Sequence, residues 1–128
     1  MILKNNEVIG ILDWELSTLG HPIADFSYHC LSWRTQEAFW DEAKLKELGI
    51  PSEKEYMEMY CENSGKDLSK NWEFYMAFNM FKIAGILQGI LGRVRDGTAA
   101  SKHAEERGNM VFPLSQAAWT TIEDNFLK

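Results

Sequence analysis

The sequence predicts a mainly α-helical domain that follows a short N-terminal β-hairpin. Two patterns indicate this fold class: two apolar stretches flank a run of turn residues over 1–12, and helical periodicity dominates from residue 22 onward. The 128 residues contain 45% hydrophobic and 25% charged side chains, which is close to the average for soluble globular proteins. We therefore expect one domain that spans residues 1–128.

The hairpin is predicted from three consecutive stretches. Residues 1–3 are apolar, residues 4–7 supply turn chemistry, and residues 8–12 form a second, β-branched run. Because that run is apolar on both faces, we expect a strand that is covered from both sides and ends at Asp13.

Three shorter helices are predicted before the middle of the chain. The first covers 22–34, because a proline at residue 22 suits the first turn of a helix. A short helix is expected at 42–48, and a longer one through residue 63 begins at a capping box of Ser52 and Glu55.

The longest helical pattern runs from about residue 72 to residue 94 and is apolar nearly all round. Lys82 lies near its centre, so we expect the central buried helix of a helical lobe rather than a membrane span. Gly85 and Gly89 have the spacing that allows close helix packing. The side chains expected in the core are Phe78, Phe81 and Ile86.

The C-terminal part predicts one kinked helix or two successive helices over 99–107 and 112–126. Pro113 is the expected break between them, because proline lacks the N–H that a helix interior requires.

Charge and cysteine content narrow the functional classes. A net charge of −6 without a basic run argues against nucleic acid and against a polybasic membrane contact. Cys30 and Cys61 lie inside apolar helical patterns and are expected to be free thiols, and no spacing typical of a zinc site occurs. No signal peptide pattern is present at residues 1–10, so we expect a cytoplasmic location.

The stretch after the second predicted strand is the candidate for chemistry. An apolar run delivers the Asp13 carboxylate to the start of a loop, where it either caps a turn or holds a divalent cation. Mg²⁺ prefers one or two carboxylates together with phosphates and water. Glu15, two residues later, either shares the metal or faces solvent.

A family resemblance rests on this stretch. Residues 8–15, then Gly20-His21-Pro22 and Ala24-Asp25-Phe26, resemble the metal-binding segment of the aminoglycoside phosphotransferase (APH) and choline-kinase-like family. Residues 12–18 and 71–78 and the pair Gln88-Gly89 are similar to the kinase-like domain that is attached to acyl-CoA dehydrogenases. The resemblance covers nearly the whole chain and implies the C-terminal lobe of a protein-kinase-like (α+β) fold.

The resemblance also implies roles for individual residues. Asp13 would bridge Mg²⁺ to the phosphates of ATP, and Glu15 would be a second candidate metal ligand. Asp25 would brace the backbone of the catalytic loop, or would only interact with the dipole of its helix. His21 departs from the aspartate that is usual in the Gly-Asp-Pro turn, and we interpret it as a turn residue.

The family's Gly-rich loop, phosphate-binding lysine and catalytic loop would all precede the hairpin, and none occurs in residues 1–128. We therefore expect a C-terminal-lobe fragment without catalytic residues, inactive alone, whose full-length parent uses Mg²⁺ and ATP to phosphorylate a hydroxyl group. The acceptor would be a small molecule, either an aminoglycoside or a hydroxylated acyl compound, and an acyl-CoA dehydrogenase is a candidate partner. The alternative is a non-catalytic helical binding module or pseudokinase remnant.

Overall fold

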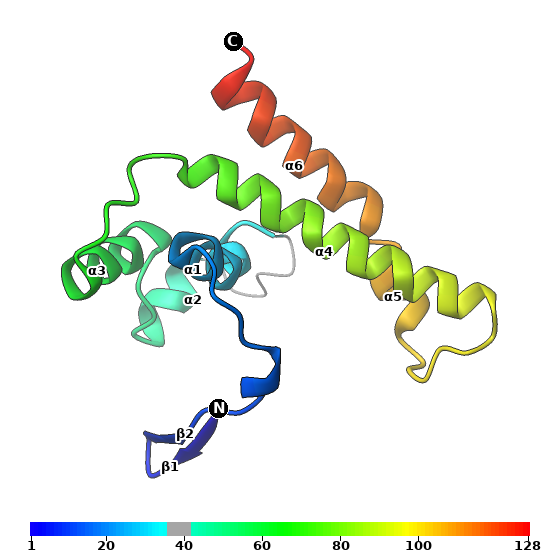
Figure 1. Cartoon of the computed structure of the whole chain (residues 1–128), viewed down its shortest axis with the longest axis horizontal. Coiled ribbons are helices and arrows are strands. Elements are labelled where there is room, and N and C mark those ends of the chain that lie inside the picture. The colour runs from blue at the N-terminus through cyan, green and yellow to red at the C-terminus, as the bar shows by residue number, and fades with distance from the viewer. Residues whose placement is uncertain (36–41) are drawn as a thin grey trace.

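The computed structural model of the chain describes residues 1–35 and 42–128. Two strands, β1 (Ile2–Lys4) and β2 (Glu7–Gly10), form an antiparallel hairpin that projects from the helices (Figure 1). Asn5 and Asn6 both have positive φ, at 49° and 63°, as a two-residue hairpin turn requires. The predicted mainly α-helical fold with an N-terminal hairpin is confirmed.

The expectation of a strand covered on both faces is wrong for this chain. Val8 and Ile9 are more than half exposed, and β2 ends at Gly10 rather than at residue 12. The strand is apolar at most positions, but within the part of the chain that the structure describes the hairpin forms its main packing with itself.

The first helices follow the predicted signals. A 3₁₀ turn, η1 (Trp14–Leu16), precedes α1 (Pro22–Cys30), and a second 3₁₀ turn, η2 (Leu31–Trp33), extends α1 almost to residue 34. Pro22 occupies the first turn of α1, where its missing N–H costs no hydrogen bond.

The capping box is also confirmed. After α2 (Glu42–Glu47), the backbone N–H of Glu55 donates to Oγ of Ser52 at 3.3 Å, and the backbone N–H of Ser52 donates to Oε2 of Glu55 at 2.8 Å. This pair begins α3 (Glu53–Ser64), which Gly65 ends in the left-handed conformation at φ 66°.

The central helix is α4 (Trp72–Arg95), as predicted. It packs against α1, α5 (Ala104–Gly108) and α6 (Val111–Phe126), and α6 lies beside it along much of its length (Figure 1). By length and composition alone this helix could also cross a membrane. One side of α4 is buried in the core of the lobe. The fully or nearly buried residues on that side are Trp72, Met76, Ala77, Asn79, Met80 and Ala84.

The predicted burial of three residues of α4 is wrong. Phe78, Phe81 and Ile86 are 48%, 70% and 50% exposed. A helix that is apolar all round does not specify which side its neighbours cover. Here α1 and α6 cover the side that carries Met76, Met80 and Ala84, so the other apolar positions remain at the surface.

Two further predictions are corrected at the C-terminal end. Within the described residues, a Cβ atom added to Gly85 or Gly89 would meet nothing within 4 Å, so these glycines do not mediate close packing there. A Cβ atom added to Gly108 would lie 2.3 Å from Cδ2 of Leu91. Pro113 does not break a helix. It lies in the first turn of α6, where proline is tolerated, and the break falls between α5 and α6.

Arg34 connects three segments that are distant in sequence. Its Nε lies 2.8 Å from Oε1 and 2.9 Å from Oε2 of Glu53 at the start of α3, and its Nη2 lies 2.9 Å from Oε1 of Glu73 at the start of α4. Nε1 of Trp72 also donates to Glu53, at 3.3 Å. Paired, planar contacts of this kind fix the relative orientation of the elements that carry them.

Candidate functional site

The Asp13 carboxylate is presented by a strained loop. Asp13 lies three residues beyond β2, with φ 64° and ψ 33°, and directly precedes η1. Residues other than glycine adopt this left-handed conformation at a cost of roughly 1 kcal/mol, and such strain is concentrated at functional sites. The side chain is exposed and makes no capping hydrogen bond to η1, so its oxygens are available to a ligand.

Glu15 and Asp25 are exposed as well, Glu15 within η1 and Asp25 in the first turn of α1. Among the described residues, no group of three or more His, Cys, Asp or Glu side chains could hold a metal ion. A cation at Asp13 would therefore need ligands beyond these side chains. That matches the chemistry of Mg²⁺, which takes one or two carboxylates and completes its shell with phosphate oxygens and water.

A buried polar network fixes the helix that carries Asp25. Asn79 of α4 is 1% exposed, and its Nδ2 donates to the carbonyl oxygen of Ala24 and to Oγ of Ser27, both at 2.8 Å. The hydroxyl of Ser27 in turn donates to the same carbonyl oxygen at 3.2 Å. Because each buried polar group has a partner, the network holds the first turns of α1 in place against α4.

His21 occupies the position just before α1 without capping it. Its ring stacks on Tyr75 of α4, with ring centroids 4.9 Å apart and an angle of 19° between the planes. The histidine thus packs the N-terminal end of α1 against the central helix.

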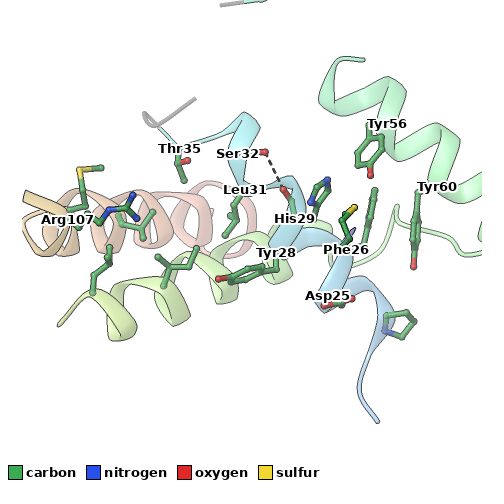
Figure 2. Close-up of a pocket in the computed structure, with 16 residues that line it drawn as sticks. Asp25, Phe26, Tyr28, His29, Leu31, Ser32, Thr35, Tyr56, Tyr60 and Arg107 are labelled. Atoms are coloured by element: carbon green, nitrogen blue, oxygen red, sulfur yellow. Dashed lines mark hydrogen bonds between the residues drawn. The ribbon is translucent and has the colours of Figure 1, made fainter. Parts of the chain in front are cut away.

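A groove of about 920 Å³ runs beside α1. Figure 2 shows Asp25 and Arg107 toward opposite ends of its lining, with Tyr28 and Leu31 between them. Most of the lining is apolar or aromatic, and Asp25 is the one carboxylate that the described residues contribute to it. The groove therefore suits an elongated ligand that is mainly apolar and carries polar groups at its ends.

Aromatic stacking forms the wall of the groove next to α3. The rings of Phe26 and Tyr60 lie 3.8 Å apart at 13°, and the ring of Tyr56 lies 5.6 Å from that of His29 (Figure 2). These contacts attach α3 to α1. They keep Asp25 and the aromatic wall at one end of the groove.

Cys30, at the end of α1, is not a candidate nucleophile. It is fully buried, and this burial, together with the nearby Glu53, raises the pKa of its thiol to about 12. A thiol with so high a pKa is almost entirely protonated near neutral pH and reacts slowly. Both Cys30 and Cys61 are free, as predicted.

Comparison with known proteins shows which proteins the chain resembles. The profile of the phosphotransferase enzyme family (APH) matches residues 1–60, the part that contains the hairpin, Asp13, Glu15 and Asp25. A solved structure from Ralstonia eutropha JMP134, named as an aminoglycoside phosphotransferase, superposes with a TM-score of 0.80 at 44% identity and covers 94% of this chain. In both comparisons the chain is similar to phosphotransferases. Its fold is that of the C-terminal lobe of a protein-kinase-like structure, as the resemblance implied.

Relatives of this chain include much longer proteins. The chain is 42% identical to mouse acyl-CoA dehydrogenase family member 10 and 37% identical to the human family member 11, in each case over 88% of its length. It spans 11% and 15% of those two proteins, and 37% of the solved chain from R. eutropha. The predicted similarity to the kinase-like domain of acyl-CoA dehydrogenases is confirmed.

The structure brings some of the predicted site residues together and leaves others apart. Asp13 and Glu15 share one exposed turn, whereas Asp25 faces the groove on the next helix. Arg107 was not singled out from the sequence, where it is one of several basic residues near helix ends. Only the folding of α5 back along α4 places it at the groove, and no local sequence signal indicates that.

Proposed function

We propose that this segment is the metal-binding and acceptor-binding lobe of an ATP-dependent phosphotransferase that phosphorylates a hydroxyl group of a small molecule. The observation that carries the proposal is the exposed carboxylate of Asp13, which makes no capping hydrogen bond to η1. The backbone of Asp13 is in the left-handed conformation, and the residue lies within the part of the chain that matches the phosphotransferase family. Such a carboxylate fits Mg²⁺, and Mg²⁺ bound with ATP supplies neutralisation of the charge on the β- and γ-phosphates.

Asp13, Glu15 and Asp25 have separate roles in this proposal. Asp13 would hold the cation, with Glu15 on the same turn as a second ligand or as a source of negative charge close by. Asp25 would accept hydrogen bonds from the backbone of a catalytic loop supplied by a longer protein, which would orient that loop. The network of Asn79, Ser27 and the Ala24 carbonyl supports this role, because it fixes the turn of α1 on which Asp25 lies.

The groove beside α1 favours a partly apolar acceptor. An aminoglycoside carries several ammonium groups, and the described lining offers them one carboxylate, Asp25, and also presents the positive charge of Arg107. A hydroxylated acyl compound would place its chain on the apolar lining. Relatives named acyl-CoA dehydrogenase family members contain the matched segment, which supports a dehydrogenase as the partner in a longer protein.

The replacement Asp13→Asn tests the proposal because it removes the charge and keeps the size of the side chain. In a longer protein that contains this segment, turnover in a coupled assay of ATP consumption should fall by several orders of magnitude, with little change in acceptor affinity. Glu7→Gln, at an exposed position of β2, is the matched control and should leave turnover unchanged. Full turnover by Asp13→Asn would contradict the role of Asp13.

The 128-residue chain itself provides a second test. One or two carboxylates without a phosphate-binding loop give little net affinity, so titration calorimetry should show weak binding of Mg²⁺–ATP that Asp13→Asn hardly changes. Micromolar binding that depends on Asp13 would mean that this chain alone forms the nucleotide site. A longer protein that binds the acceptor but never transfers phosphate would instead favour the non-catalytic binding module.

A further inference from the structure

A second groove, distinct from the one beside α1, lies between α4 and α6. It has a volume of about 410 Å³, and the described residues of its lining include no ionisable side chain. Its floor consists of small residues, Ala77 on α4 and Ser115 and Ala118 on α6. Its walls are large side chains, which are Phe74, Phe78 and Phe81 on α4 and Trp119 and Ile122 on α6. The two helices lie side by side along this groove (Figure 1).

The walls protrude into solvent to an extent that is unusual for aromatic residues. Phe81 is 70% exposed and Trp119 is 56% exposed, while the floor residues Ala77 and Ala118 are buried. Phe112 and Phe126, 75% and 47% exposed, extend the same side of α6, because positions 112, 119 and 126 recur at helical spacing.

The uncovered area is large enough for a stable interface. Taking about 200 Å² for each aromatic side chain, the six aromatic residues of this face expose about 700 Å² together. The largest apolar patch on an ordinary monomer is about 300–600 Å². A standard protein–protein interface buries about 800 Å² on each partner, which these residues nearly supply by themselves.

The face also complements itself. A two-fold interface needs one surface that presents both protrusions and hollows, because each residue of one copy meets its counterpart region in the other. Here Phe81 and Trp119 are the protrusions, and the small floor at Ala77 and Ala118 is the hollow. The net charge of −6 does not oppose the contact directly, since the groove lining carries no ionisable side chain.

We propose that the α4–α6 face docks a second copy of this chain, and that the two copies form a two-fold symmetric dimer through the groove. Aromatic walls of each copy insert over the small-residue floor of the other, so that α4 and α6 of both copies pack as a four-helix arrangement. The dimer leaves the groove beside α1 and the exposed turn of Asp13 outside the contact, because both belong to other parts of the lobe.

Sedimentation equilibrium of the 128-residue chain over roughly micromolar to 100 μM concentrations tests the proposal. The expected mass rises from 14.8 kDa to twice that value. Phe81→Glu places a charge at the centre of the interface in both copies and should raise the dissociation constant roughly 30-fold or more, as the loss of a central aromatic contact does. Its far-UV circular dichroism should be unchanged, because Phe81 is mostly exposed in the monomer.

Two control variants separate this face from the other exposed apolar surfaces. Ile86→Glu alters α4 outside the groove, and Ile9→Glu alters the exposed hairpin; both should dimerise like the unmodified chain. A 14.8 kDa monomer at every concentration would overturn the proposal and leave the groove to a different protein or to another part of a longer one. Dimerisation that Ile9→Glu abolishes and Phe81→Glu leaves intact would overturn it too, and would place the contact at the hairpin.

Discussion

Replacing Gly108 with alanine should destabilise the lobe, although alanine is the better helix former. Gly108 ends α5 where this helix meets α4, and it is buried. An added Cβ would lie 2.3 Å from Cδ2 and 2.4 Å from Cγ of Leu91. Ordinary contacts begin at 3.4 Å, so the Leu91 side chain or α5 itself has to move by about 1 Å.

The magnitude follows from two opposing effects. Overpacking by one methyl group in a filled site costs about 1–3 kcal/mol, whereas the gain in helix propensity from glycine to alanine is at most about 1 kcal/mol. We expect a net loss of about 1–2 kcal/mol in the free energy of unfolding. Gly85→Ala and Gly89→Ala are matched controls in the interior of α4, where a Cβ meets nothing within 4 Å, and each should stabilise by about 0.5–1 kcal/mol.

Urea unfolding followed by circular dichroism at 222 nm measures all three variants. The chain concentration should be low enough to keep the monomer, and equal m-values are required before the free energies are compared. Leu91→Ala removes the atoms that the new methyl group would meet, so Gly108→Ala should cost much less in that background. Stabilisation by Gly108→Ala equal to that of the two controls would refute the steric reasoning.

Three further predictions concern Asn79 and Phe81 on α4 and Cys30 on α1. Asn79→Ala should lower the free energy of unfolding by about 2–4 kcal/mol in urea titrations, because it removes two hydrogen bonds in the interior and leaves a cavity. Asn109→Ala, at an exposed position, is the control. Phe81→Ala should change the stability of the monomer by less than about 1 kcal/mol, since Phe81 is 70% exposed, and a cost of 3 kcal/mol would mean that the side chain is buried. Burial raises the pKa of Cys30 to about 12 from an ordinary value of 9.0, so Ellman's reagent at pH 8 should modify one thiol rapidly in the native chain and two after denaturation. The free energy of unfolding should fall as the pH rises from about 9 toward 12, because the thiol ionises more readily in the unfolded chain. Two rapidly reacting native thiols would contradict this prediction.

Local signals in the sequence predicted the elements that depend on neighbouring residues. The capping box of Ser52 and Glu55 is satisfied within four residues, and the asparagine pair at 5–6 supports its hairpin turn by backbone conformation alone. The length of α4 followed from its long apolar stretch. None of these features needs knowledge of what lies across the fold.

Features that join distant residues could not be predicted in this way. Phe81 and Met80 are adjacent apolar residues, and only the positions of α1 and α6 decide that one is exposed and the other buried. The hydrogen bond between Asn79 and Ser27 joins residues 52 positions apart. The family resemblance identified Asp13, Glu15 and Asp25 as candidates, but the groove that Asp25 shares with Arg107 emerged only from the packing of α5 on α4.

The contacts of Arg34 have a consequence for how this lobe can vary between relatives. Arg34 and Glu53 bound the connection between η2 and α3, and their paired hydrogen bonds hold the two ends of that connection together. The entropy needed to close a loop grows only with the logarithm of its length, about 0.6 kcal/mol for each doubling. With the ends fixed by side chains, residues can be added or removed between them at little cost to α1, α3 or α4. Differences in length among related proteins should therefore accumulate between residues 35 and 52, while the arginine and its two glutamate partners stay in place.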